Sequence, residues 1–387
     1  MSHYEVGIVG AGIHGASVAH HLGRAGVSTA LFERATPASG PTGRSSAVCR
    51  SGYTNPFLAR MAHESIAMFE RFADVTGGGD AGYDRTGMLY LHRAQDSGPA
   101  LDALLAELTG LGIAVEEVTG DRLREEFPGL QIGDGERAVW EPGAGHADPT
   151  GTTRGLLDDA VRHGVTAHLR TPIAAIAARE RGGAALASAA GEAFTVDRLL
   201  IAAGPWTGPL LSQLGVELPL VVERHVVATF GWGEAPRLPY VLGDVAGGYY
   251  LKPEGPEQYG LGSLLAEAQV DPDDYAEEVG VEEATEHAER AIARVPALGA
   301  SVPAGGWASL YDVSPDWQPV IGAVGDGIFV SAGTSGHGFK LAPALGRHIA
   351  DLVAGSGHDA ALDQFTPDRF AAGATLAAGF GDARILG

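Results

Sequence analysis

The stretch Val6-Gly7-Ile8-Val9-Gly10-Ala11-Gly12-Ile13-His14-Gly15 decides the fold. The apolar run over residues 4–9 predicts a buried strand, and a G-x-G-x-x-G pattern follows it at once. In this pattern the first glycine makes a tight turn and the second lets the backbone approach a pyrophosphate. The third lets the next helix pack against the strand. We therefore expect a helix over about residues 13–25 with its N-terminus facing phosphates.

The next residues support a dinucleotide site. Gly26 ends the predicted helix, and residues 27–32 predict a second strand that leads into Glu33 and Arg34. A carboxylate about 20 residues beyond the glycines accepts hydrogen bonds from an adenosine ribose and disfavours NADP. The alternative is a purely structural strand–helix–strand turn. The pattern alone does not distinguish NAD from FAD.

Composition limits the remaining function classes. The chain has 387 residues, enough for two domains with separate cores. Its net charge of −22 would repel nucleic acid and anionic lipid, and no apolar stretch reaches the roughly 20 residues of a membrane helix. We expect a soluble, cytoplasmic protein without nucleic-acid or membrane partners. The single cysteine, Cys49, excludes an internal disulfide, and no histidine pair at metal-ligand spacing has supporting residues, so no metal is predicted.

Three further segments add a family resemblance. They are residues 42–53 (Thr42 to Tyr53), 199–206 (Leu199 to Trp206) and 333–340 (Gly333 to Lys340). With the N-terminal pattern they resemble the FAD-dependent amine oxidoreductases of the D-amino-acid oxidase superfamily, especially the sarcosine oxidase and glycine oxidase branch. The resemblance runs from Tyr4 to about Val353, and residues 335–340 are its most specific part.

The resemblance implies an α/β fold of mixed α+β character with a discontinuous, Rossmann-like FAD-binding domain. That domain would comprise residues 1–82, 145–215 and 318–387. Residues 83–144 and 216–317 would form a substrate domain on a mixed β-sheet. Apolar runs at 218–222 and 226–230, and a hairpin of 248–253 with 259–262, predict its strands. The acidic stretch 271–289 predicts a solvated surface helix.

The fingerprint and the resemblance together imply a set of residues that contact FAD. They are Gly10, Gly12, Ile13, His14, Gly15, Glu33, Arg34, Thr42, Arg44, Ser45, Ser46, Ile173, Ala203, Gly204, Trp206, Gly333, Ser335, Gly336, His337, Gly338, Phe339 and Lys340. Monomeric sarcosine oxidases tether FAD through a cysteine two residues before the tyrosine that corresponds to Tyr311. Ser309 stands there in this chain, so we expect non-covalent FAD.

Lys340 is an unusual residue for its position. It falls in the first turn of a predicted helix, where the helix dipole disfavours a cation by roughly 0.3–1 kcal/mol. The chain also prefers arginine, since Lys252 and Lys340 are its only lysines. The resemblance implies that Lys340 and Arg50 grip a substrate carboxylate, and the alternative for both is surface charge. Residues 333–336 would present the helix N-terminus to the flavin pyrimidine and stabilise negative charge there.

The remaining candidates concern the substrate cavity and oxygen. The resemblance places Tyr250 and Tyr311 in the cavity wall, although buried tyrosines also occur in cores. It places a lysine for oxygen activation where this chain has Gly260. Lys252 lies two residues after Tyr250, so in a strand both share one face. We hypothesise that Lys252 takes part of the missing role, and the alternative is a solvated hairpin residue.

The function implied is FAD-dependent oxidation of the C–N bond of a small amino acid or N-substituted glycine. Hydride transfer to flavin, hydrolysis of the imine and reoxidation by O₂ to H₂O₂ would follow. One alternative is an amino-acid dehydrogenase that passes electrons to a quinone or carrier protein. Another is a non-catalytic flavin-binding subunit. An NAD-dependent dehydrogenase fits the first 35 residues but leaves residues 335–340 unexplained. No oligomeric state is predicted.

Overall fold

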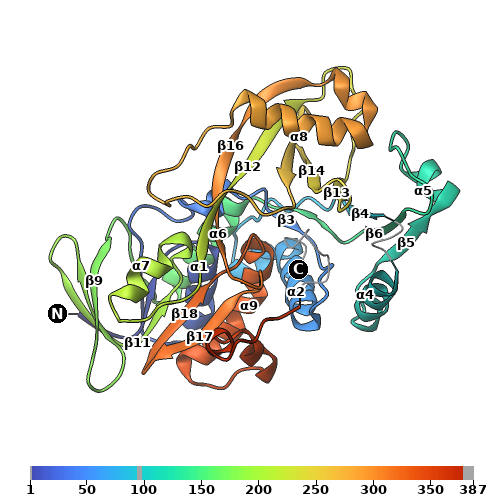
Figure 1. Ribbon diagram of the computed structural model, residues 1–387. Coiled ribbons are helices and arrows are strands. Elements are labelled where there is room, and N and C mark those ends of the chain that lie inside the picture. Colours follow the sequence, from blue (N-terminus) through green and yellow to red (C-terminus); the bar gives the residue numbers. More distant parts are fainter. Residues whose placement is uncertain (1, 94–97, 378–387) are drawn as a thin grey trace.

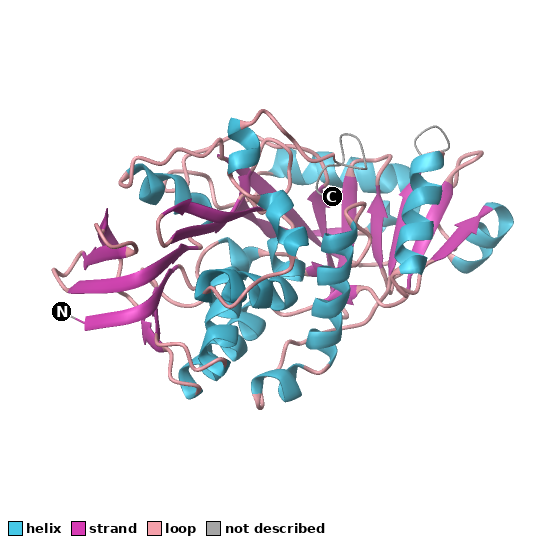
Figure 2. Ribbon diagram, turned by 90° about the horizontal axis from the view of Figure 1, so that it is seen from below, coloured by secondary structure: helices cyan, strands magenta, loops and turns pink. Residues whose placement is uncertain are grey.

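The computed structural model describes residues 2–93 and 98–377. Met1, residues 94–97 and residues 378–387 lie outside the described part, including the end of the predicted FAD-binding segment 318–387. Two large sheets form the framework (Figure 1). Seen from below, the strands of the first sheet lie on the left and those of the second on the right (Figure 2).

The first sheet is built around β1 (Ser2–Val9), which contains the predicted strand. Its strand order is β17-β18-β11-β1-β2-β8, with β10 and β9 extending β11 on an antiparallel branch. β1 pairs in parallel with β2 and with β11, although β11 lies almost 200 residues further along the chain. Its other strands are β2 (Thr29–Phe32), β8 (Thr166–His168), β9 (Ile173–Ala178), β10 (Ala184–Ser188), β11 (Ala193–Ile201), β17 (Val320–Gly325) and β18 (Ile328–Ala332).

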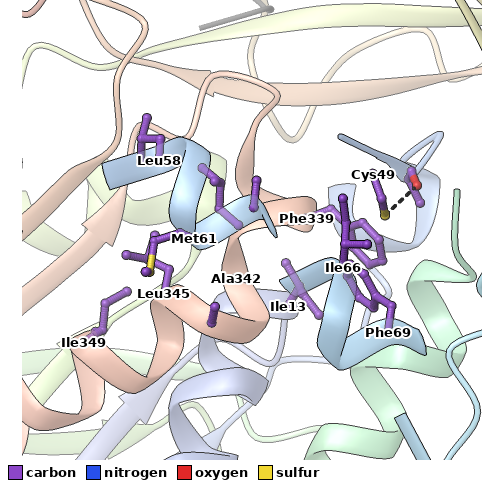
Figure 3. Packing of buried hydrophobic residues seen from close by; sticks show 14 of the residues in the cluster. Ile13, Cys49, Leu58, Met61, Ile66, Phe69, Phe339, Ala342, Leu345 and Ile349 are labelled. Carbon is purple, nitrogen blue, oxygen red and sulfur yellow. Dashed lines mark hydrogen bonds between the residues drawn. The ribbon is translucent and has the colours of Figure 1, made fainter. Parts of the chain in front are cut away.

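Helices cover this sheet. α1 (Ile13–Arg24) packs between α6 (Pro149–Arg162) and α9 (Gly338–Ala354), and α2 (Pro56–Glu70) packs on α9. Figure 3 shows the apolar side chains between α2 and α9, where Phe69 stacks on Phe339 with ring centroids 5.4 Å apart. This packing fixes the N-terminus of α9 against residues from the first quarter of the chain.

The second sheet is mixed and has the order β16-β12-β15-β14-β13-β4-β6-β5. Its strands are β4 (Met88–His92), β5 (Glu116–Thr119), β6 (Arg137–Glu141), β12 (Val221–Gly231), β13 (Val241–Asp244), β14 (Tyr249–Glu254), β15 (Gln258–Ser263) and β16 (Val302–Val313). β12 contains the run predicted at 226–230 and only the last two residues of the run predicted at 218–222, and β14 and β15 form the predicted antiparallel hairpin. The predicted α/β fold with mixed sheets is therefore confirmed.

The acidic stretch differs from its prediction. The helix there, α8 (Val281–Arg294), begins at Val281 and packs on the second sheet, so the expectation of a helix from residue 271 is wrong. Asp271 instead turns the chain, because its carboxylate accepts a hydrogen bond from the Asp273 amide at 2.9 Å. We call residues 271–278 the acidic strap. The remaining short elements are β3 (Val48–Cys49), β7 (Gly145–His146), α3 (Phe72–Thr76), α4 (Pro99–Gly110), α5 (Gly120–Glu126), α7 (Thr207–Ser212) and α10 (Asp368–Ala371).

Across residues 2–93 and 98–377, no helix is both long enough and apolar enough to cross a membrane.

Gly15→Ala tests the contact on which the first sheet depends. A Cβ at Gly15 would lie 1.9 Å from the Gly10 carbonyl oxygen, so α1 would have to move away from β1. We expect a loss of about 1–3 kcal/mol in the free energy of unfolding, measured by urea denaturation. Gly208→Ala in α7 is the matched control, because nothing lies within 4 Å of its added Cβ. Equal stability of the two variants would contradict the prediction.

Candidate active site

A cavity of about 390 Å³ lies where β1, β2, β11 and β18 end. Parallel strands present their carboxyl ends at one edge of a sheet, where α/β folds bind ligands. Most of the predicted FAD contacts line this cavity. They are Gly10, Gly12, Ile13, His14, Glu33, Arg34, Thr42, Ser45, Ile173, Ala203, Gly204, Trp206, Gly336, Gly338 and Phe339.

The glycine turn has the geometry of a dinucleotide cradle. Gly10 has φ +109°, and a Cβ there would lie 2.3 Å from the Ala202 carbonyl oxygen. Both Glu33 oxygens accept backbone hydrogen bonds, from the amides of Ala11 at 2.9 Å and Ala35 at 2.8 Å. The carboxylate is thus fixed at the cavity wall beside the turn. Gly15 lies at the helix–strand contact, behind that wall.

The loop over residues 333–338 carries left-handed backbone at Gly333 (φ +60°), Ser335 (φ +49°) and Gly336 (φ +80°). For Ser335 this conformation costs on the order of 1–3 kcal/mol, so the surroundings must hold it. Its amide donates to the Asp312 carbonyl at 2.9 Å, and its hydroxyl accepts from the Ser314 amide at 3.2 Å. Ser335 is fully buried beneath the cavity wall, as is His337 at the N-cap of α9.

Asp312 is a cavity residue that the sequence reasoning missed. Its carboxylate accepts hydrogen bonds from the Gly333 amide at 2.7 Å and from the Thr334 hydroxyl at 3.0 Å. Burial raises the pKa of this carboxyl to about 6. The only sequence signal is its place directly after Tyr311, which gives no hint that the side chain turns toward residues 333–334.

The two predicted carboxylate-binding cations are both buried. Arg50 donates to the Gly52 carbonyl at 2.6 Å and lies 4.5 Å over the ring of Tyr53. The Lys340 ammonium lies 3.4 Å from the Gly336 carbonyl oxygen. Burial and, second, the nearby charge of Arg50 lower the pKa of Lys340 to about 7. The surface-charge alternative is therefore wrong for both residues, since Arg50 is 2% and Lys340 7% exposed.

A buried acid braces the same loop. Glu141 accepts hydrogen bonds from the Ser51 amide at 2.7 Å and from the Tyr90 hydroxyl at 2.9 Å. Burial raises the pKa of its carboxyl above the ordinary value. Sequence reasoning missed Glu141 because it belongs to β6, far along the chain from Arg50.

A second, smaller hollow adjoins the first cavity, and Ser45 and Tyr311 line both. Tyr250 also lines it, and its hydroxyl donates to the Ser46 hydroxyl at 3.0 Å. Burial raises the pKa of Tyr250 to about 12 and that of Tyr311 further. Both phenols are neutral near pH 7 and can donate hydrogen bonds.

Lys252 is buried, 5% exposed, so its interpretation as a solvated hairpin residue is wrong. It stands directly opposite Gly260 in the β14–β15 pair, and Tyr250 stands opposite Gly262. Side chains of cross-strand partners point to the same face. The Lys252 side chain therefore lies on the same face of the sheet as Tyr250 and as Gly260, the position where the resemblance expects a lysine. Its ammonium pairs with Glu254 at 2.6 Å.

The acidic strap reaches from the second sheet to residues of the first cavity (Figure 1). Asp273 accepts a hydrogen bond from the Trp206 indole at 2.8 Å, and the Arg34 guanidinium lies 3.8 Å over the Trp206 ring. Arg44 donates to Tyr275 at 3.0 Å and to Glu277 at 2.7 Å. Arg44 therefore lines the second hollow and faces the strap, not the first cavity.

In the described ranges, no group of three or more His, Cys, Asp or Glu side chains is placed to hold a metal ion.

Comparison with known proteins identifies the cofactor of this chain. The family described as DAO, FAD dependent oxidoreductase, matches residues 5–352. The chain belongs to this family. The resemblance and the prediction of FAD are thereby confirmed, and the residues present fit the cofactor, because a Cβ at Gly10 or Gly15 would collide with the backbone of the cradle.

Relatives differ in their reactions. The chain is 26% identical to dimethylglycine dehydrogenase of Rattus norvegicus over 390 residues, which cover 95% of this chain and 45% of that protein. It therefore spans less than half the length of that relative. It is 29% identical to glycine oxidase of Pseudomonas aeruginosa, covering 91% of this chain and 95% of the other. The structure of L-proline dehydrogenase from P. horikoshii shares the fold, with a TM-score of 0.86, 21% identity, and coverage of 97% and 100%.

We expect acid or heat precipitation to release FAD into the supernatant, where its absorbance and fluorescence measure it. Ser309 offers no thiol, and Cys49 is fully buried in β3 with burial raising its thiol pKa to about 12. A thiolate therefore does not form there to attack the flavin. Cys49→Ser is the control and should release the same amount. Flavin that stays with the pellet would contradict the prediction.

Proposed function

We propose that the protein oxidises the C–N bond of a small amino acid or N-substituted glycine and passes the electrons to O₂. The observation that carries this proposal is the buried pair of cations, Arg50 and Lys340, which lie close enough for the charge of Arg50 to lower the pKa of Lys340. Two buried cations close together complement an anionic group that enters the cavity. A substrate carboxylate supplies that anion, and relatives named glycine oxidase and monomeric sarcosine oxidase agree with this substrate class.

The chain's own residues divide the work of binding and orienting the substrate. Arg50 and Lys340 bind the carboxylate, while Tyr250 and Tyr311 wall the cavity with neutral phenols. The amides at the start of α9 stabilise negative charge at the cavity wall. Bound FAD supplies the hydride acceptor. Water then hydrolyses the imine product to an amine and a carbonyl compound.

Two observations keep an amino-acid dehydrogenase as the second candidate. Gly260 stands where the resemblance expects the oxygen-activating lysine, and the nearby Lys252 is paired with Glu254. Electrons would then go to a quinone or carrier protein. A peroxide assay under air during turnover separates the two, because only the oxidase forms H₂O₂ in proportion to substrate consumed.

A non-catalytic flavin-binding subunit is the remaining alternative, and anaerobic bleaching of the flavin by sarcosine, glycine, proline or a D-amino acid would exclude it. We also propose two domains. The FAD-binding domain comprises residues 1–82, 145–215 and 318–387, and the substrate domain comprises residues 83–144 and 216–317. We further propose that the enzyme works in the cytoplasm.

The carboxylate clamp predicts a pH dependence of anion binding. With the pKa of Lys340 near 7, the lysine is charged at pH 6 and loses its proton as the pH rises through that value. The affinity for methoxyacetate, an amine-free carboxylate, should therefore fall above about pH 7 by up to tenfold per pH unit. Titration of the flavin absorption spectrum measures this affinity.

Lys340→Met should bind methoxyacetate more weakly at pH 6, by about 2–5 kcal/mol, and show no such pH dependence. Arg50→Gln should bind weakly as well but keep a pH dependence, displaced to higher pH because Arg50 no longer lowers the pKa of Lys340. Both variants should retain FAD. Wild-type affinity in either variant would remove that residue from the clamp.

Lys252 gives a prediction for the reaction with oxygen. A fixed positive charge beside the reduced cofactor stabilises superoxide as it forms. Lys252→Met should slow reoxidation by air at least tenfold, equivalent to about 1.4 kcal/mol, with little change in anaerobic reduction. Lys252→Arg, which keeps the charge, is the matched control. An unchanged rate in Lys252→Met would exclude Lys252 from this step, and slow reoxidation of the unaltered protein would favour the dehydrogenase.

A further inference from the structure

A buried histidine–carboxylate pair lies in the second hollow, and the clamp does not use it. Glu223 and His225 are two residues apart on β12, and they are 5% and 4% exposed. The His225 Nε2 lies 3.1 Å from the Glu223 Oε2, and the same oxygen accepts a hydrogen bond from the Glu267 amide at 3.0 Å. A carboxylate in this position holds the tautomer with its proton on Nε2 and leaves Nδ1 as the basic nitrogen.

The imidazole belongs to the wall of the substrate region. Its ring stacks on Tyr311 with centroids 3.9 Å apart and an interplanar angle of 19°. His225 lines the second hollow together with Tyr250, and Tyr311 connects that hollow to the flavin cavity. Nδ1 is buried and has no hydrogen-bond partner within the described residues. A buried polar atom without a partner is costly, and it indicates a ligand that completes the hydrogen bond.

We propose that His225 is the base that takes the proton from the substrate ammonium group. The proposal rests on the proposed oxidation of an amino acid, since hydride leaves the α-carbon only when the nitrogen has a free electron pair. In this step one N–H bond of the ammonium breaks, a bond from that proton to Nδ1 forms, and the electron pair stays on the substrate nitrogen. The proton later passes from Nδ1 to water, so no oxidant or reductant is consumed.

The hollow sets the route of this proton. Its volume is about 10 Å³, the space of about one water molecule. The proton therefore passes to Nδ1 directly or through one water, the distance over which general bases act. Glu223 stabilises the imidazolium that results, as carboxylates do in other histidine–carboxylate pairs.

Other titratable groups around the ring also act on its charge. Glu223 lies on the same strand, Glu267 interacts with Tyr311, and the phenols of Tyr250 and Tyr311 stay neutral. Arg44 reaches the hollow from the residue 41–44 turn, but Glu277 pairs with its guanidinium. The charged groups around the ring are thus two carboxylates and one guanidinium, and the guanidinium is paired with Glu277.

The test compares rates of anaerobic flavin reduction from pH 6 to pH 10 in stopped flow. The substrate is whichever of sarcosine, glycine and proline reduces the wild-type flavin fastest. His225→Gln should reduce at least tenfold more slowly at pH 7. The deficit should shrink toward about pH 10, where free amine is present without a base. Glu223→Gln should give a smaller deficit with the same trend.

His287→Gln is the matched control, because His287 is equally buried, has an unpartnered Nε2 and belongs to α8. It should behave as the wild type. Methoxyacetate has no ammonium, so its affinity should be unchanged in His225→Gln, which shows that the cavity is intact. If His225→Gln does not retain FAD, His225→Ala and Glu223→Gln carry the test.

A wild-type pH profile in His225→Gln, or an equal deficit at every pH, would overturn the role of His225 while leaving the proposed function standing. If no amino acid reduces the wild-type flavin at any pH, the proposed function fails, and the role of His225 fails with it.

Discussion

The close approach of α1 to β1 and of the glycine turn to β11 is the constraint on which the site depends. Neither Gly10 nor Gly15 has space for a side chain, since a Cβ would lie 2.3 Å from the Ala202 carbonyl oxygen or 1.9 Å from that of Gly10. Because α1 lies this close, α9 can pack beside it and bring residues 333–340 to the same cavity as residues 10–15. Asp312 lines that cavity, the strained Ser335 lies buried beneath its wall, and Lys340 follows in the first turn of α9.

The two buried cations have different physical properties, and the proposed carboxylate clamp depends on the difference. Arginine stays charged at any physiological pH, whereas a buried lysine changes its protonation state readily. Arg50 is fixed by its own loop, and Lys340 responds to burial and to that neighbouring charge. In the proposed clamp this lysine would make anion binding responsive to pH, in a chain of net charge −22 that otherwise favours arginine.

Local patterns predicted the first strand, turn and helix, because each property of a dinucleotide turn depends on residues close in sequence. The hairpin of β14 and β15 was predictable for the same reason. The acidic strap was not predictable in this way. Its composition is typical of a surface helix, but Asp271 turns the chain. The residues that contact the strap, Arg34, Arg44 and Trp206, are distant from it in sequence.

In the candidate site, too, some residues were predictable from the sequence and others depend on contacts between distant segments. Most residues that the resemblance assigned to FAD line the cavity, and Arg50 and Lys340 are buried, while their role in binding a carboxylate stays a prediction. The place of Lys252 on the face of Tyr250 depends on the β14–β15 register. Sequence patterns did not indicate a role for Asp312, Glu141 or the Glu223–His225 pair. The role of each depends on hydrogen bonds that form only in the folded protein. Side chains that act through distant neighbours leave no spacing signature.

The order of the strands also determines when the protein can fold during its synthesis. β1 leaves the ribosome well before its partner β11, which ends at Ile201, and β18 and α9 follow only at residues 328–354. The nascent chain must therefore carry an open sheet edge and part of the apolar face of α1 until these later residues have been made. Parallel pairing over such separations is slow, so cellular protection of the unfinished chain, and not only the stability of the finished one, sets how much active enzyme a cell obtains.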